Sequence, residues 1–121
     1  MVKVTNVRVE LFNPDQRIKS AIDSHGQQFL DQRVLKDSNF YIPADTWNLR
    51  DSSLIHSDIG NGELIWQTPY ARRLYYNPQY NFSKDKNPNA RGLWFEEAKS
   101  KHKDRWIKET EREVRKRLGR R

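Results

Sequence analysis

The sequence predicts an α+β fold: an N-terminal strand, an amphipathic helix, a β-hairpin, a long loop and a long C-terminal helix packed on a small antiparallel sheet. Apolar residues recur at helical spacing in two long segments, and they alternate in the segment that follows a Gly-Asn-Gly turn. A length of 121 residues is typical of one domain. We expect a single domain over residues 1–111, followed by a basic helix end or tail over residues 112–121.

The composition argues against several classes of protein. Hydrophobic residues make up 35% of the chain and the mean hydropathy is -1.07, so we expect a modest core. An aromatic content of 12%, with four Trp, is too high for a disordered chain. There is no Cys, which excludes a disulfide framework and a thiolate metal site. No long apolar run is present, so we expect neither a signal peptide nor insertion into a membrane.

The N-terminal third contains a strand followed by a helix. Residues 2–12 alternate as a strand does, with a slip of one residue at Thr5-Asn6 that indicates a break. Asn13 and Pro14 form a good helix start, because Asn caps the first turn and Pro suits the first helical position. We expect this helix to run to about Lys36, with an apolar stripe formed by Ile18, Ala21, Ile22, His25, Phe29, Leu30 and Val34.

The middle of the chain predicts a turn and a hairpin. In residues 42–53, Pro43 favours an extended approach and the short polar side chains that follow favour a turn. Residues 53–59 and 63–68 then form the two expected strands of the hairpin, joined by Gly60-Asn61-Gly62.

The second half ends in a long helix. Residues 69–76 predict one or two helical turns, and residues 77–91 form a polar segment that is long for a loop in a compact domain. After Gly92, apolar and aromatic residues recur near one face of a helix, namely Phe95, Ala98, His102, Trp106 and Val114.

No pattern in the sequence indicates an active site. The histidines (His25, His56 and His102) lie far apart, so we expect two to pack on helix faces and one to lie in a strand, rather than to bind a metal. There is no phosphate-binding glycine loop, nucleophile elbow or carboxylate pair. The residues therefore give no positive evidence for an active site, a cofactor or a small-molecule substrate.

The positive charge is concentrated at the C-terminus. Residues 101–121 hold ten basic and four acidic side chains and so carry +6 of the net charge of +7. Three interpretations stay open: a solvated helix face, an arm that contacts nucleic-acid phosphates, and a docking segment for an acidic protein. The candidate contacts with DNA or an acidic partner are Arg112, Arg115, Lys116, Arg117, Arg120 and Arg121.

Half of the aromatic residues lie between Tyr70 and Phe95. Several of them would form the core where the last helix meets the hairpin. Tyr80 and Phe82, however, lie within the long polar loop, where aromatic side chains are typical anchors of protein–protein interfaces. We therefore predict an interface role for these two.

Three motifs in fixed order give the chain a family resemblance. Pro-x-Asp-Thr-x-x-Leu-Arg-x-Ser begins at Pro43, Pro-Tyr-Ala-x-x-x-Tyr-Tyr begins at Pro69, and Trp-Phe-Glu-x-Ala-Lys begins at Trp94. Over roughly residues 14–110 the chain resembles bacteriophage minor capsid proteins related to head–tail joining and tail-completion proteins. One position departs from that pattern, because Trp47 stands where Gly usually follows Asp-Thr. A glycine there permits a positive φ, which Trp adopts only with strain.

The resemblance implies a structural virion protein of a long-tailed phage, made in the host cytoplasm and assembled as a ring in the neck. It also implies that the protein is not an enzyme, and we expect no cofactor and no small-molecule substrate. The implied partners are other copies of the chain, neighbouring connector and tail proteins and, in passing, packaged DNA. Ring closure needs two different patches on each subunit, and our candidates are the loop 77–91 and the segment 45–52. The candidate interface residues are Asp45, Thr46, Trp47, Leu49, Arg50, Tyr70, Tyr75, Tyr76, Tyr80 and Phe82.

A second hypothesis rests on size and charge alone. Small basic nucleic-acid-binding proteins and toxin-type ribonucleases are also short α+β chains. In that case Arg72, Arg73, Tyr75 and Tyr76 would be the candidate site residues.

Overall fold

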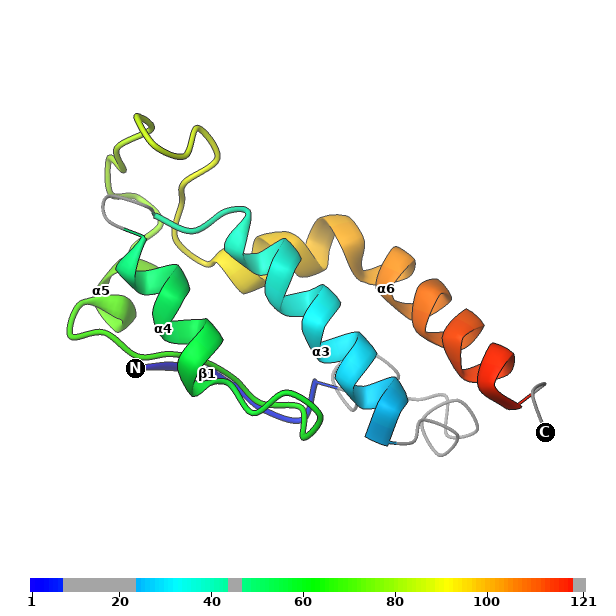
Figure 1. Ribbon diagram of the computed structural model, residues 1–121. Coiled ribbons are helices and arrows are strands. Elements are labelled where there is room, and N and C mark those ends of the chain that lie inside the picture. Colours follow the sequence, from blue (N-terminus) through cyan, green and yellow to red (C-terminus); the bar gives the residue numbers. More distant parts are fainter. Residues whose placement is uncertain (8–23, 44–46, 119–121) are drawn as a thin grey trace.

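The computed structural model describes residues 1–7, 24–43 and 47–118 (Figure 1). In chain order the elements are β1 (Val2–Val4), α3 (Ser24–Asn39), α4 (Asn48–His56), β2 (Leu64–Trp66), α5 (Ala71–Tyr75) and α6 (Trp94–Leu118). The α+β class predicted from the sequence is confirmed. The expected helix start at Asn13-Pro14, and Ile18, Ala21 and Ile22 of the expected stripe, lie outside the described residues.

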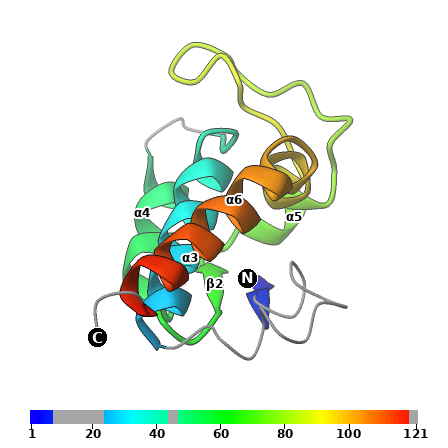
Figure 2. The same cartoon turned by 90° about the vertical axis from the view of Figure 1, so that its right-hand side faces the viewer.

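Two long helices, α3 and α6, lie side by side and form the main body of the molecule (Figures 1 and 2). Leu30 and Val34 of α3 and Trp106 of α6 are fully buried. The indole N–H of Trp106 donates a hydrogen bond of 2.6 Å to the Asp37 carboxylate, and Arg105 pairs with the same carboxylate. The buried Trp106 side chain, its hydrogen bond to Asp37 and the Arg105–Asp37 ion pair therefore hold the two helices together.

The two strands form a small antiparallel sheet in which Val2 lies opposite Trp66 and Val4 lies opposite Leu64. The Gly60-Asn61-Gly62 turn before β2 was predicted correctly, and φ is 103° at Gly60 and 74° at Gly62. Such positive φ values suit glycine because it has no Cβ.

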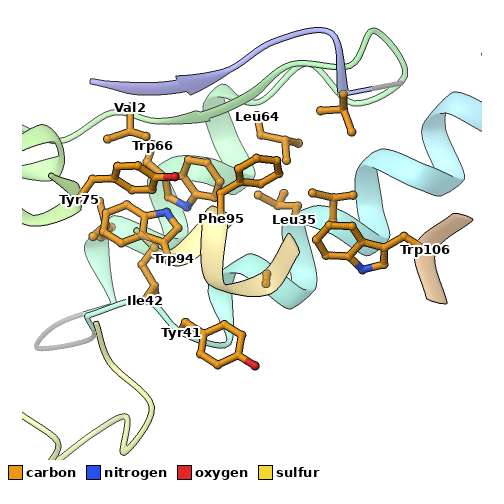
Figure 3. Packing of buried hydrophobic residues seen from close by; sticks show 14 of the residues in the cluster. Val2, Leu35, Tyr41, Ile42, Leu64, Trp66, Tyr75, Trp94, Phe95 and Trp106 are labelled. Carbon is orange, nitrogen blue, oxygen red and sulfur yellow. The ribbon is translucent and has the colours of Figure 1, made fainter. Parts of the chain in front are cut away.

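An aromatic cluster connects the sheet to the start of α6 (Figure 3). Trp94 meets Trp66 edge to face at a centroid distance of 5.8 Å, and Tyr75 meets Trp94 in the same way at 4.7 Å. All three rings are buried. The predicted helical turn at α5 and the predicted terminal helix thus meet in one core.

The first strand of the predicted hairpin is wrong. Residues 53–56 belong to helix α4, and β2 pairs with β1. The end of the expected hairpin next to the turn does form, as an isolated antiparallel bridge in which the Asp58 N–H donates to the Glu63 carbonyl oxygen at 2.8 Å. The hydroxyls of Ser52 and Ser57 instead accept hydrogen bonds from the backbone N–H groups of Gln67 (3.1 Å) and Ile65 (2.8 Å). Side-chain oxygens of α4 and of the residue that follows it therefore satisfy donors that a second neighbouring strand would otherwise have paired with.

The predicted apolar stripe of the first long helix was also partly wrong. Leu30 and Val34 are buried as expected, but His25 is exposed and Phe29 is half-buried. The buried face includes the polar residues Gln27 and Asp31. Asp31 accepts hydrogen bonds from the backbone N–H groups of Gly60 (2.8 Å) and Gly62 (2.9 Å). Gln27 in turn donates a hydrogen bond of 2.8 Å to Asp31. A pattern of hydrophobic residues misses this face, because two of its members are polar side chains that are buried to hold the turn.

The ends of β1, α3 and α6 can be compared with the ends predicted from the sequence. The strand at the N-terminus ends at Val4, and Asn6 has a positive φ of 53°, which agrees with the predicted break at Thr5-Asn6. Helix α3 continues to Asn39, three residues beyond the expected end. Helix α6 passes residue 112 without interruption, and Val114 is buried.

Candidate functional site

Trp47 precedes α4 in the left-handed conformation, with φ 62° and ψ 9°. Its carbonyl oxygen accepts the Asp51 N–H at 2.9 Å and so begins the helix. The guanidinium of Arg50 lies 4.6 Å from the centroid of the indole ring, a cation–π geometry. The backbone thus keeps the conformation that glycine would favour, and the indole packs against the edge of the core.

The outward side of α4 presents two aliphatic side chains to solvent. Leu54 is 63% exposed and Ile55 is 74% exposed, whereas Leu49, Ser52 and Ser53 on the inward side are buried. We call Leu54 and Ile55 the α4 patch. Sequence reasoning did not select these two residues because it placed them in a strand. With the helix recognised, their position opposite Leu49 and Ser53 would have identified them.

A second group of exposed apolar residues consists of aromatic side chains near the loop 77–91. Phe40, Tyr76 and Tyr80 are 55%, 59% and 43% exposed. Tyr80 also contacts Phe82, with their ring centroids 6.3 Å apart. We call Phe40, Tyr76, Tyr80 and Phe82 the loop patch. Phe40 was missed because it follows the end of a helix, where the sequence carries no interface signal.

The loop is fixed to the body at its far end. The side-chain amide of the buried Asn87 donates to the carbonyl oxygens of Phe40 (3.0 Å) and Ile42 (2.8 Å). The Arg91 N–H donates to the carbonyl oxygen of Tyr41 at 2.9 Å. These bonds place Phe40 next to the loop, although the two segments lie far apart in the sequence (Figure 1).

Two of the predicted interface residues belong to the core. Leu49 is 2% exposed and Tyr75 is 4% exposed, so neither can contact a partner unless the core opens. Burial raises the pKa of the Tyr75 phenol well above its usual value, and the charge of Glu96 adds to the effect. Tyr70 is half-buried against the core. Asp45 and Thr46 lie outside the described residues.

The cations at the basic end of the chain differ in exposure and in whether an acidic side chain lies beside them. Arg112, Arg115 and Lys116 are exposed on α6, and Arg115 lies 3.7 Å from Glu111. Arg117 is half-buried and already engaged. Arg120 and Arg121 lie outside the described residues. Lys108 is exposed on the same side of α6 and was not among the predicted contacts.

The candidate residues of the alternative hypothesis differ in exposure, and Tyr76 is exposed. Arg72 and Arg73 are exposed on α5, but the adjacent Tyr75 is buried in the core. His56 ends α4 instead of lying in a strand, and it is remote in sequence from the exposed His25. Among residues 1–7, 24–43 and 47–118, no group of three or more His, Asp or Glu side chains is arranged to hold a metal ion.

The described helices include none that combines the length and the apolar character needed to cross a bilayer. The described residues present three candidate surfaces: the α4 patch, the loop patch and the basic side of α6.

A comparison with protein families assigns the chain to a known group. A family model described as minor capsid protein matches residues 5–114. Neither the curated proteins nor the solved structures gave a match. The matched region contains all three sequence motifs and extends beyond the roughly 14–110 expected from them. The chain belongs to the bacteriophage minor capsid protein family.

Proposed function

We propose that this structural phage protein forms a ring in the neck of a long-tailed virion, where it joins the head-side connector to the tail. Membership of a minor capsid family implies a virion component and suggests a role other than catalysis. The observation that carries the proposal further is the presence of two different apolar patches on one small subunit. Exposed apolar side chains that gather in patches are typical of association surfaces.

The two patches differ in chemistry and position. The α4 patch is aliphatic and lies near the end of α4, whereas the loop patch is aromatic and surrounds the loop 77–91. In both orientations of the cartoon the last turn of α4 lies away from that loop (Figures 1 and 2). A two-fold dimer joins identical patches, whereas a ring joins two different patches by repeated rotation. The arrangement on this subunit favours the second kind of assembly.

The remaining predicted interface residues suit this arrangement. Trp47 and Arg50 lie at the start of α4, beside the exposed side of that helix, and their stacking presents a flat apolar and cationic surface. Tyr76, Tyr80 and Phe82 lie within the loop patch. Trp, Tyr and Arg are the residue types that most often dominate the binding energy of interfaces.

The proposal is tested in a phage that carries the double substitution Leu54→Asp and Ile55→Asp in this chain. Two charges in a contact that becomes desolvated would block assembly, so we expect unjoined heads and tails by electron microscopy and a large loss of plaques. The matched control is Gln28→Asp with Gln32→Asp, which adds the same charge at exposed positions of α3. The control is expected to join heads to tails normally.

Two results would remove the neck assignment. Normal joining by the Leu54/Ile55 variant, with the variant chain present in the virion, would show that the α4 patch is not needed. Location of the wild-type chain across the capsid shell would place it outside the neck and leave only its family membership.

A further inference from the structure

Three cationic side chains form a straight row on the solvent side of α6. Lys108, Arg112 and Lys116 follow one another at a spacing of four residues, and all three are exposed. At this spacing they lie on one side of the helix and extend over about 12 Å. The side of α6 packed in the core, marked by Trp106, Thr110 and Val114, faces the other way. We call Lys108, Arg112 and Lys116 the α6 basic row.

Three other cations on α6 lie beside carboxylates. Lys101 lies 3.2 Å from Glu97, Arg105 pairs with Asp37 on α3, and Arg115 lies 3.7 Å from Glu111. Within the part of the chain that the structure describes, no ion pair joins any member of the row to an acidic side chain. Glu111 lies beside the row but is engaged by Arg115. The row therefore adds little to the stability of the helix, and its charge is available to a partner.

We propose that the α6 basic row contacts the phosphate backbone of duplex DNA. Neighbouring members of the row lie about 6 Å apart along a rigid helix. Duplex DNA carries one negative charge for about every 1.7 Å of its axis. A phosphate can therefore lie within reach of each cation in such a row. Contact with phosphates needs no aromatic platform and reads no base sequence.

A second copy of the chain is a poorer partner for this row. Residues 1–100 contain thirteen basic and twelve acidic side chains, so the body of another subunit offers no surplus of negative charge. Duplex DNA supplies that charge continuously. Three contacts are also fewer than the six to ten, or thereabouts, of tight non-specific binders, so DNA held in this way remains free to slide.

The inference changes which residues carry the contact. It adds Lys108 to the predicted set, keeps Arg112 and Lys116, and removes Arg115 because Glu111 already neutralises it. It stands apart from the proposed neck role, because binding is measured on the purified chain without heads or tails.

The test measures the affinity of the purified full-length chain for a random-sequence DNA duplex as salt is raised from about 50 to about 200 mM. Three phosphate contacts contribute a slope of about −2.7 in a plot of log affinity against log salt, which is about a 40-fold loss over this range. In the triple variant Lys108→Gln, Arg112→Gln and Lys116→Gln, the slope is expected to become shallower by about that amount.

The matched control removes three cations that are already paired: Lys3→Gln, Lys101→Gln and Arg115→Gln, whose partners are Glu63, Glu97 and Glu111. Both triple variants lose the same net charge. A much larger loss of binding in the row variant supports the proposal. An equal loss in both variants would show that only net charge matters and would overturn it. Unchanged binding in the row variant, with a loss of a protein contact in the assembled virion, would assign the row to an acidic protein instead.

Discussion

At the scale of single residues, Trp47 occupies a backbone conformation that suits glycine. Its φ of 62° lies in the left-handed region, which costs an ordinary residue about 1–2 kcal/mol. The indole compensates through its contact with the core edge and with Arg50, 4.6 Å away. A bulky side chain therefore stands in a turn whose backbone conformation suits glycine.

Comparison of two substitutions at Trp47 separates strain from packing. Trp47→Gly and Trp47→Ala both remove the indole, but only Ala retains the left-handed strain. We expect the Gly variant to have the higher free energy of unfolding, by about 1 kcal/mol. Urea denaturation measures this difference. Equal stability of the two variants would mean that position 47 relaxes to an ordinary conformation when the indole is removed.

Asp31 is a second residue whose role depends on burial. Burial raises the pKa of its carboxyl above the ordinary value, and the hydrogen bonds from Gln27, Gly60 and Gly62 oppose that rise. Between the unfolded and folded pKa values the folded protein holds more of the proton than the unfolded chain does. The contribution of Asp31 to stability is therefore present at low pH and is lost as pH rises through that interval, which begins near 3.8.

The substitution Asp31→Asn tests this pH dependence. Asn keeps an acceptor oxygen for the glycine N–H groups but does not ionise, so the fall in stability between about pH 4 and the raised folded pKa should disappear. Denaturation curves at several pH values measure it. Parallel pH profiles for the variant and the wild type would contradict this role.

The substitution Asp31→Ala tests the hydrogen bonds themselves. It leaves the N–H groups of Gly60 and Gly62 without their acceptor and should lower the free energy of unfolding by about 2–4 kcal/mol. Thermal and urea denaturation check this expectation. A variant as stable as the Asn form would show that the turn does not depend on the carboxylate.

At the scale of elements, α4 takes the place of a strand beside β2. Ser52 both donates to the Leu49 carbonyl oxygen at 2.7 Å and accepts the Gln67 N–H at 3.1 Å. Next to it, Ser53 accepts a hydrogen bond from the Asn39 side chain at 3.0 Å, and Asn39 accepts the indole N–H of Trp66 at 2.8 Å. The serines of α4 thus connect the helix to the sheet and to the end of α3.

The substitution Ser52→Ala should weaken this connection. The Gln67 N–H loses its acceptor, which costs about 1–3 kcal/mol where the group stays away from water. We expect lower stability in urea and faster amide hydrogen exchange at Gln67. Ser100→Ala, at an exposed position of α6, is the control and should change neither. Unaltered exchange at Gln67 would indicate that another acceptor takes the place of Ser52.

At the scale of the whole molecule, the two patches make a prediction about how copies combine. If the α4 patch of one copy binds the loop patch of the next, each type of variant retains one working patch. We expect a mixture of the Leu54→Asp/Ile55→Asp variant and a Phe40→Asp/Tyr80→Asp variant to form pairs but no rings.

Light scattering and electron microscopy distinguish the outcomes, with the wild-type assembly formed under the same conditions as the reference. Each variant alone should remain monomeric. Self-association of the loop-patch variant through its intact α4 patch would indicate a two-fold contact and would contradict a head-to-tail ring.

Much of the fold was predictable where the information is local. The Gly60-Asn61-Gly62 turn, α5 and the long helix α6 each follow from glycine chemistry or from periodicity within one segment. The hairpin strand was wrong because residues 53–56 continue helix α4, and β2 pairs with β1, which lies about sixty residues earlier. Residue patterns near one position do not reveal a partner so distant.

The candidate surfaces were predicted less completely than the fold. Of the residues predicted as contacts, Tyr76, Tyr80, Arg112 and Lys116 are exposed, whereas Leu49 and Tyr75 are buried. Leu54, Ile55, Phe40 and Lys108 were missed. Exposure is a property of the packed molecule, so a motif identifies residues of interest without showing which of them face solvent.

By itself, the sequence determined the family and the local elements, because motif order, turn residues and helical periodicity can be recognised from the order of the residues without knowledge of the fold. The tertiary structure alone decided which strand pairs with β2, which side of α4 is free, and which cations of α6 lack a carboxylate. Those features depend on contacts between segments that are distant in sequence. Trp47 shows both levels, since the motif marked it as unusual and only the fold showed that it keeps a positive φ.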